Sequence, residues 1–275
     1  MPPRALRAFK RAALDAPMRS LVLPVTISPP GSSMAAAEVF PVLAAIFRQI
    51  IGESPYQSPT DMGVNMAGNC ITDDEVCCEA SRQEIIRRYY AAMCSARQGM
   101  SDSRPAEKIK LLINQLGITV KDRPVIDAAV ARAEQTGEPA AAIQLPDGEI
   151  VTGKTTKLLG ACAAVLLNAL KRLGGIQKDM HLISPIVIEP IQDLKVNHLG
   201  NHSPRLHMDE VLIALSISAA TNPTAEVAMR QLDKLRGCEA HSTVILSGVD
   251  SSTFRKLGIN VTCEPKYQTK KLYHK

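Results

Sequence analysis

The chain has 275 residues, of which 45% are hydrophobic and 21% charged, a balance typical of a globular protein that folds in water. Its formal net charge of +5 is concentrated at the start, because residues 1–37 contain Arg4, Arg7, Lys10, Arg11 and Arg19 against the single acid Asp15. The remainder is nearly neutral, aromatic residues make up only 3% of the chain, and no apolar stretch is long enough for a bilayer, so we expect neither a nucleic-acid partner nor a membrane span.

The cysteines indicate a reducing compartment. There are seven, an odd number, at irregular spacing and without a C-x-x-C pair. Such usage is typical of reduced thiols rather than of a disulfide framework. We therefore expect a cytoplasmic protein.

Patterning along the chain predicts three parts. Residues 1–37, rich in Arg, Ala and Pro, are expected to be a disordered leader. Residues 38–138 predict a helical subdomain, with helical periodicity over 38–51, 73–97, 109–116 and 124–137.

Residues 139–275 predict an α/β subdomain. Strand patterns cover 140–145, 149–152, 181–183, 242–246 and 259–262. Helical patterns separate them, over 156–173, from 184 onward, and over 209–220, 224–236 and 250–258. Strands that alternate with helices form a sheet covered on its faces, so the fold class is mixed α/β.

The string from Gly148 to Thr155 matches the phosphate-binding pattern G-x-x-x-x-G-K-[ST] letter for letter. In a phosphate-binding loop, Gly153, Lys154 and Thr155 would contact a nucleotide and its magnesium ion. The local chemistry favours another structure, because Pro146-Asp147-Gly148 is a tight-turn signal and residues 149–152 have strand-like composition. We therefore predict a β-hairpin that leads into a helix, with Gly153, Lys154 and Thr155 kept as candidate ligand contacts.

Two polar groups are further site candidates. Asp61, Asn65 and Asn69 lie among glycines in a loop, where backbone can approach a ligand closely; turns closed by the Asp and Asn side chains are the alternative. His207, Asp209 and Glu210 crowd the start of a helix, just after Arg205. Helix capping explains the two acids but neither His207 nor Arg205.

Cysteine and histidine pairs are weaker candidates. Cys238 and His241 are three residues apart before a strand, and Cys263-Glu264 lies at the end of the last strand. The pair is compatible with a nucleophile and its base or with a soft-metal site, although free cysteines are usually buried apolar residues. His198 and His202 have the spacing of a zinc-binding helix, but Leu199 stands where the catalytic Glu belongs. We predict no metal site, and the sequence specifies no cofactor.

Several long segments are distinctive enough to indicate a family. They are Ser54–Cys70, Gln83–Tyr90, Asp209–Ser218 and Gly237–Ser242. With them, the chain from about Glu38 onward resembles the bacterial family catalogued as domain of unknown function 1846.

This resemblance implies several expectations. Family members are longer, so the chain is expected to be similar to their C-terminal part, with residues 1–37 unlike the family. The C-terminal portion of the family looks similar to the cytidine-deaminase-like α/β sandwich. The zinc-binding signature of those deaminases is absent here, so no deaminase chemistry is expected. Some members carry the label ATP-dependent peptidase.

Three hypotheses for function follow. The first is an enzyme or binding protein for a small polar ligand or nucleotide, held between the two subdomains by Asp61–Asn69, Lys154 and His207. The second is a non-catalytic remnant or assembly module that lacks the N-terminal half of the site, and it is compatible with a homo-oligomer. The third is the ATP-dependent peptidase of the family labels.

Overall fold

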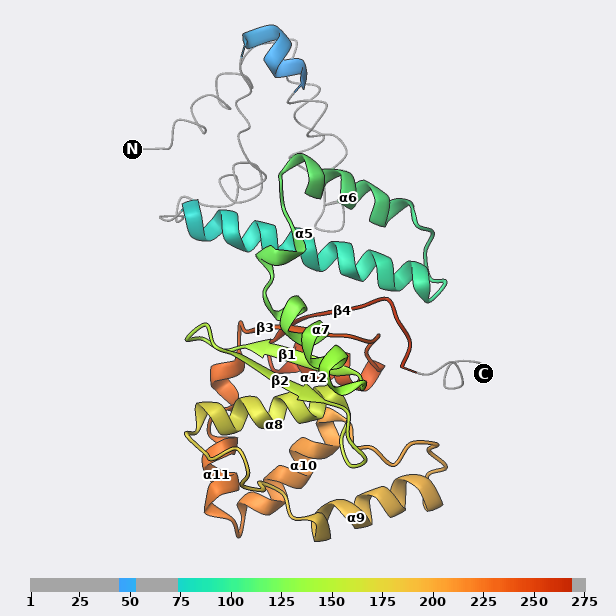
Figure 1. Ribbon diagram of the computed structural model, residues 1–275, viewed down its shortest axis with the longest axis vertical. Coiled ribbons are helices and arrows are strands. Elements are labelled where there is room, and N and C mark those ends of the chain that lie inside the picture. The colour runs from blue at the N-terminus through green and yellow to red at the C-terminus, as the bar shows by residue number, and fades with distance from the viewer. Residues whose placement is uncertain (1–44, 53–73, 269–275) are drawn as a thin grey trace. The chain divides into compact units, whose positions relative to one another are not determined.

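The computed structural model describes residues 45–52 and 74–268 (Figure 1). The candidate residues Asp61, Asn65 and Asn69 lie outside the described residues. The chain divides into two compact units: Met1–Tyr89 with Arg104–Thr119, here called the helical unit, and Tyr90–Ser103 with Val120–Lys275, the sheet unit.

The helical unit contains most of helix α5 (Asp74–Arg97) and all of α6 (Arg104–Gln115), besides a helical stretch at 45–51. Helix α6 places Ala106 and Ile109 on its buried side, as the periodicity of the sequence predicts. The last two turns of α5, from Tyr90, belong to the sheet unit.

The predicted hairpin is confirmed. Strand β1 (Ala140–Gln144) pairs antiparallel with β2 (Ile150–Lys154), with Ala140 opposite Lys154 and Gln144 opposite Ile150. The Leu145 N–H donates to the Glu149 carbonyl at 2.8 Å, and Gly148 takes the positive φ of 86° that the turn requires. The backbone of the Gly148–Thr155 string is therefore extended and paired, and does not wrap around an anion.

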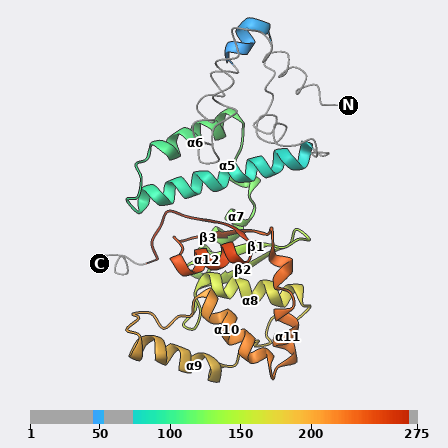
Figure 2. The same ribbon diagram turned by 180° about the vertical axis from the view of Figure 1, so that it is seen from behind.

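In the described part of the chain, four strands form the sheet, in the order β2-β1-β3-β4. Strand β3 (Glu239–Ser242) runs antiparallel to β1, and β4 (Asn260–Cys263) runs parallel to β3. Helix α7 (Val125–Thr136) packs against Ala142 on one face, whereas Ala141 and Ile143 belong to the cluster on the other face with α8 (Ala161–Leu173). Figures 1 and 2 show these two helices on opposite sides of the sheet.

The position of α7 affects how the chain divides. The sequence patterns placed the end of the helical part at residue 138, before the first strand. In the structure Val125 and Ala129 of α7 are buried against the sheet, so the residues from Val120 onward group with the strands. Helical periodicity alone does not reveal which core a helix joins.

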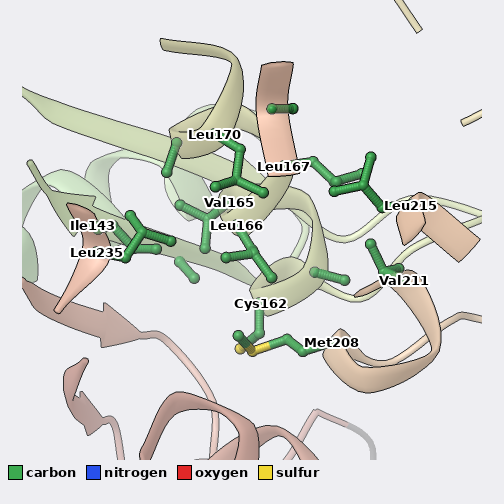
Figure 3. Packing of buried hydrophobic residues seen from close by; sticks show 14 of the residues in the cluster. Ile143, Cys162, Val165, Leu166, Leu167, Leu170, Met208, Val211, Leu215 and Leu235 are labelled. Atoms are coloured by element: carbon green, nitrogen blue, oxygen red, sulfur yellow. The ribbon is translucent and has the colours of Figure 1, made fainter. Parts of the chain in front are cut away.

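The main apolar cluster lies on the α8 side of the sheet (Figure 3). Helices α10 (Met208–Ala219), α11 (Pro223–Met229) and α12 (Gly248–Lys256) pack there, and α9 (Pro185–Asp193) joins through Ile188. The predicted helix at 224–236 is shorter than expected, because α11 ends at Met229 and a 3₁₀ turn, Leu232–Leu235, follows. Alternating strands and helices thus form a mixed α/β fold.

The strand predicted at 181–183 is wrong. Leu182 and Ile183 are buried in the apolar cluster, but they lie in a bend before α9 and pair with no strand among the described residues. A short apolar run marks burial and does not by itself specify a strand.

Arg123, just before α7, is completely buried. Its guanidinium forms an ion pair with Glu239 and donates to the carbonyl oxygens of Ala240 at 2.8 Å and Asn260 at 2.9 Å. The planar guanidinium offers several donors in fixed directions, which suits it to hold two strands and a helix start together.

Candidate functional site

The candidate site is built where the segment Arg205-Leu206-His207 enters α10. Leu206 is fully buried and forms a parallel bridge with Leu159, and the Gly160 N–H donates to its carbonyl at 3.1 Å. His207 has extended backbone. Because side chains alternate along extended backbone, Arg205 and His207 leave the chain on the side opposite to the buried Leu206.

His207 is held by a carboxylate from another helix. Its Nδ1 lies 3.0 Å from Oδ2 of Asp250 in the first turn of α12, while its side chain keeps 40% of its surface exposed. The imidazole Nε2 has no hydrogen-bond partner among the described residues. One ring nitrogen is therefore fixed by the protein and the other faces outward.

Both oxygens of the Asp250 carboxylate accept further hydrogen bonds. Oδ1 accepts the backbone N–H of Met208 at 3.0 Å, and Oδ2 accepts the hydroxyl of Ser247 at 2.8 Å. The Ser247 hydroxyl also accepts the Asp250 N–H and so caps α12. This carboxylate thus joins the N-terminal ends of α10 and α12, where the helix dipoles favour a negative charge.

The pKa values of His207 and Asp250 shift in opposite directions, as this geometry requires. The hydrogen bond with Asp250 raises the pKa of His207 above its usual value, although burial opposes the shift. Burial by itself would raise the pKa of Asp250, but the hydrogen bonds from His207, Met208 and Ser247 outweigh it and hold the pKa below its usual value. Asp250 is therefore a carboxylate wherever His207 titrates.

A second ion pair supports the His207 backbone. Glu210 Oε2 accepts both the His207 N–H and the ammonium of Lys195, each at 2.7 Å. Lys195 is only 3% exposed, and its Nζ also donates to the Arg205 carbonyl at 2.7 Å. It comes from a π-helical turn, Leu194–His198, a distortion that often occurs at functional sites.

Arg205 adds a positive charge on the same side as His207. Its Nε donates to the Thr156 carbonyl at 2.9 Å, which fixes the start of the guanidinium. In the described part of the chain, the two terminal nitrogens have no partner. A guanidinium presented in this way matches the geometry of a carboxylate or phosphate.

The remaining candidates lie elsewhere. Asp209 is exposed and its carboxylate accepts the N–H of Glu210, so the partner of His207 is not the adjacent acid but Asp250, 43 residues away. Gly153 and Lys154 lie inside β2, and Thr155 is buried with its N–H bonded to the Pro139 carbonyl.

Cys238 and His241 are not neighbours in space. Cys238 belongs to the apolar cluster on the α8 side, whereas His241 contacts Thr262 at 2.8 Å and the Tyr90 ring. No group of three or more potential metal ligands was found among the described residues.

Asp250, Ser247 and Lys195 were not predicted as site residues. From the sequence, Asp250 stands only as the first residue of the helix predicted over 250–258. Lys195 lies in no motif. The positions of these residues along the sequence do not indicate that they lie near His207.

Comparison with known proteins places this chain in a family. Residues 34–117 match the family described as domain of unknown function DUF1846, N-terminal, and residues 121–273 match domain of unknown function DUF1846, C-terminal. The match therefore covers both regions of the family, where similarity to the C-terminal part alone was expected.

Similar curated proteins have no assigned function in their names. A UPF0371 protein of Corynebacterium urealyticum is 50% identical over 98% of this chain, an alignment that extends into residues 1–37 and covers 55% of that protein. UPF0371 proteins of Streptococcus thermophilus and Streptococcus pyogenes are 56% and 55% identical over 86% of this chain and 48% of their own length. The chain spans about half the length of these relatives. It belongs to the family described as domain of unknown function DUF1846.

Proposed function

We propose that the sheet unit carries an acid–base site for a small anionic ligand, with His207 as the group that transfers the proton. The observation that carries this proposal is the imidazole of His207, fixed through Nδ1 by a buried carboxylate while Nε2 has no partner among the described residues. This is the arrangement that a general base or acid requires, because the carboxylate sets the tautomer and stabilises the protonated ring.

Each neighbour of His207 has a role in this proposal. Asp250 orients the ring and stabilises its charge. Lys195 and Glu210 fix the backbone from which the ring projects. Arg205 binds the anionic group of the ligand, a carboxylate or a phosphate, through its terminal nitrogens. A nucleotide is included in this class through its phosphates.

Two other expectations, an ATP-dependent peptidase and a deaminase-like protein, gain less support. The hairpin conformation of Gly148–Thr155 gives no support to nucleotide hydrolysis at that string, and hence none to an ATP-dependent peptidase. A deaminase-like sandwich is compatible with the hairpin followed by α8, but a deaminase would need zinc ligands that the described residues do not offer.

A cytoplasmic location remains part of the proposal, inferred from the cysteines. Across the described ranges, no helix is long and apolar enough to cross a membrane.

Inorganic phosphate is the probe for this site. A ligand that prefers the folded state raises the melting temperature, so phosphate should stabilise the wild type in a concentration-dependent way. Arg205→Gln should abolish this shift. Arg255→Gln, an equal loss of charge in the last turn of α12, is the matched control and should keep it. Equal shifts in wild type and Arg205→Gln would contradict the proposal.

A second candidate function, assembly into a homo-oligomer, rests on α10. Ile213 and Ile217 are each 60% exposed and lie one helical turn apart, on the side away from the buried Val211 and Leu215. Exposed apolar side chains that belong to a large contiguous patch mark protein interfaces. Sedimentation of the wild type and of Ile213→Lys/Ile217→Lys tests it. An oligomer that the substitutions dissociate would favour assembly, and a monomeric wild type would contradict it.

A further inference from the structure

Cys94 and Cys263 lie together although 169 residues separate them in the sequence. Cys94 is in the last turns of α5 that belong to the sheet unit, and Cys263 ends β4. Their sulfur atoms are 3.5 Å apart, and the Cys94 thiol also lies 3.2 Å from the Cys263 carbonyl oxygen. A disulfide requires the sulfurs to approach by about a further 1.5 Å.

Polar groups lie beside this pair. Cys162 and Cys238 belong instead to the apolar cluster, and burial raises the pKa of both of their thiols. Beside Cys263, in contrast, Glu264 lies 3.6 Å from Nε2 of the fully buried His241. That nitrogen has no hydrogen-bond partner in the part of the chain that the structure describes.

The two thiols are not equivalent. Cys94 is buried, with 8% of its surface exposed, and Cys263 is partly exposed. The hydrogen bond with Cys94 lowers the pKa of Cys263, and the same hydrogen bond together with burial raises the pKa of Cys94. Cys263 is thus the more readily ionised thiol, as an attacking cysteine requires.

We propose that Cys94 and Cys263 are a redox-modification site, which forms a reversible disulfide on reaction with a low-molecular-weight disulfide. The Cys263 thiolate attacks one sulfur of the small disulfide, forming a mixed disulfide and releasing one small thiolate, which takes up a proton. The Cys94 thiol then loses its proton and attacks the Cys263 sulfur, releasing the second small thiol. Two protein thiols are oxidised and one small disulfide is reduced to two thiols.

Peptide mapping after treatment with oxidised glutathione tests this directly. Trypsin places Cys94 alone in the peptide Tyr89–Arg97 and Cys263 alone in Leu257–Lys266. After alkylation of the remaining thiols and non-reducing digestion, these two peptides should be joined, with a mass about 2 Da below the sum of the free pair, as the loss of two hydrogens requires. Dithiothreitol should restore the separate peptides.

Single variants separate the two steps. Cys94→Ser should stop at the mixed disulfide, with glutathione retained on Cys263, whereas Cys263→Ser should leave Cys94 unmodified. Cys238→Ser is the matched control and should cross-link like the wild type. The same treatment in urea should join cysteines without preference.

Two results would overturn the proposal. One is complete alkylation of Cys94 and Cys263 in the folded, glutathione-treated wild type. The other is a mixed disulfide on Cys263 that persists in the wild type as it does in Cys94→Ser. Circular dichroism of each variant confirms that it is folded before these outcomes are compared.

Discussion

At the scale of single residues, one carboxylate links stability to the proposed chemistry. Asp250 accepts the first free N–H of α10 from Met208 and also holds the imidazole of His207. Each hydrogen bond satisfies a group that folding would otherwise leave unpaired or less well solvated. Removing Asp250 would therefore affect the helix and the ring together, and for this reason substitutions at His207 are the cleaner probe of the site.

The contribution of His207 to stability should depend on pH. Its pKa is raised in the folded state, so protonation favours folding. This stabilisation is complete below the unfolded pKa of about 6.5 and is lost as the pH rises through the higher folded value. His207→Gln should reduce the free energy of unfolding by about 1 kcal/mol at low pH, after allowance for the partial exposure of the ring.

Urea unfolding of wild type and His207→Gln measures this, at about pH 5.5 and about pH 9, on either side of the transition. The difference between the two proteins should shrink at the higher pH. Asp250 stays ionised throughout, because its pKa is held below its usual value. A difference that is equal at both pH values, or larger at the higher one, would contradict the role given to the protonated ring.

Arg123 should be intolerant of the usual conservative replacement. A lysine ammonium cannot reach Glu239 and the carbonyls of Ala240 and Asn260 at once, and the change leaves buried acceptors unpaired. Arg123→Lys should lower the free energy of unfolding by about 3 kcal/mol in urea titrations. Arg230→Lys, in an exposed ion pair, should change it by less than about 0.5 kcal/mol, and similar losses for both would refute this account of Arg123.

At the scale of secondary-structure elements, local signals predicted the hairpin and most helices but not every strand, because 182–183 form a bend and the strand expected at 242–246 lies instead at Glu239–Ser242. The turn at Pro146-Asp147-Gly148 and the β-branched residues after it predicted the hairpin against a full match to the phosphate-loop pattern. A motif names residue types, whereas the backbone conformation depends on turn chemistry and strand propensity. Gly153, the second glycine of the motif, is needed for packing instead.

Gly153 is required because β2 crosses α8 closely. A Cβ at this position would lie 2.3 Å from the backbone nitrogen of Val165, so strand and helix would have to separate. Gly153→Ala should cost about 3 kcal/mol of unfolding free energy. Gly248→Ala is the control, since a Cβ there meets no atom within 4 Å, and it should change stability by less than about 0.5 kcal/mol. Equal effects would rule out the packing explanation.

Contacts between distant segments could not be predicted in the same way. His207 meets Asp250 across 43 residues, and Cys94 meets Cys263 across 169. These contacts depend on how the elements that carry the residues pack together. Hydrophobic periodicity indicates which face of an element is buried, but it does not indicate which other element covers that face. The residues Arg205 and His207 were therefore identifiable from the sequence, whereas their partners were not.

At the scale of the whole molecule, the sheet unit holds every group that the acid–base proposal requires. The segment before α10 supplies Arg205 and His207, α12 supplies Asp250, and the π-helical turn supplies Lys195. The curated relatives are about twice as long as this chain, so the activity of such a longer protein is a separate question. The protonation of His207 can be measured without knowledge of that activity.

The most direct measurement is the titration of the histidine imidazoles by NMR, in the wild type and in Asp250→Asn. The chain contains six histidines, and His207→Gln assigns the signal by its loss. We predict that His207 titrates above the usual histidine range in the wild type and returns toward it in Asp250→Asn. A His207 pKa at or below the usual value, or one that is the same in both proteins, would contradict the proposal that Asp250 prepares this ring for proton transfer.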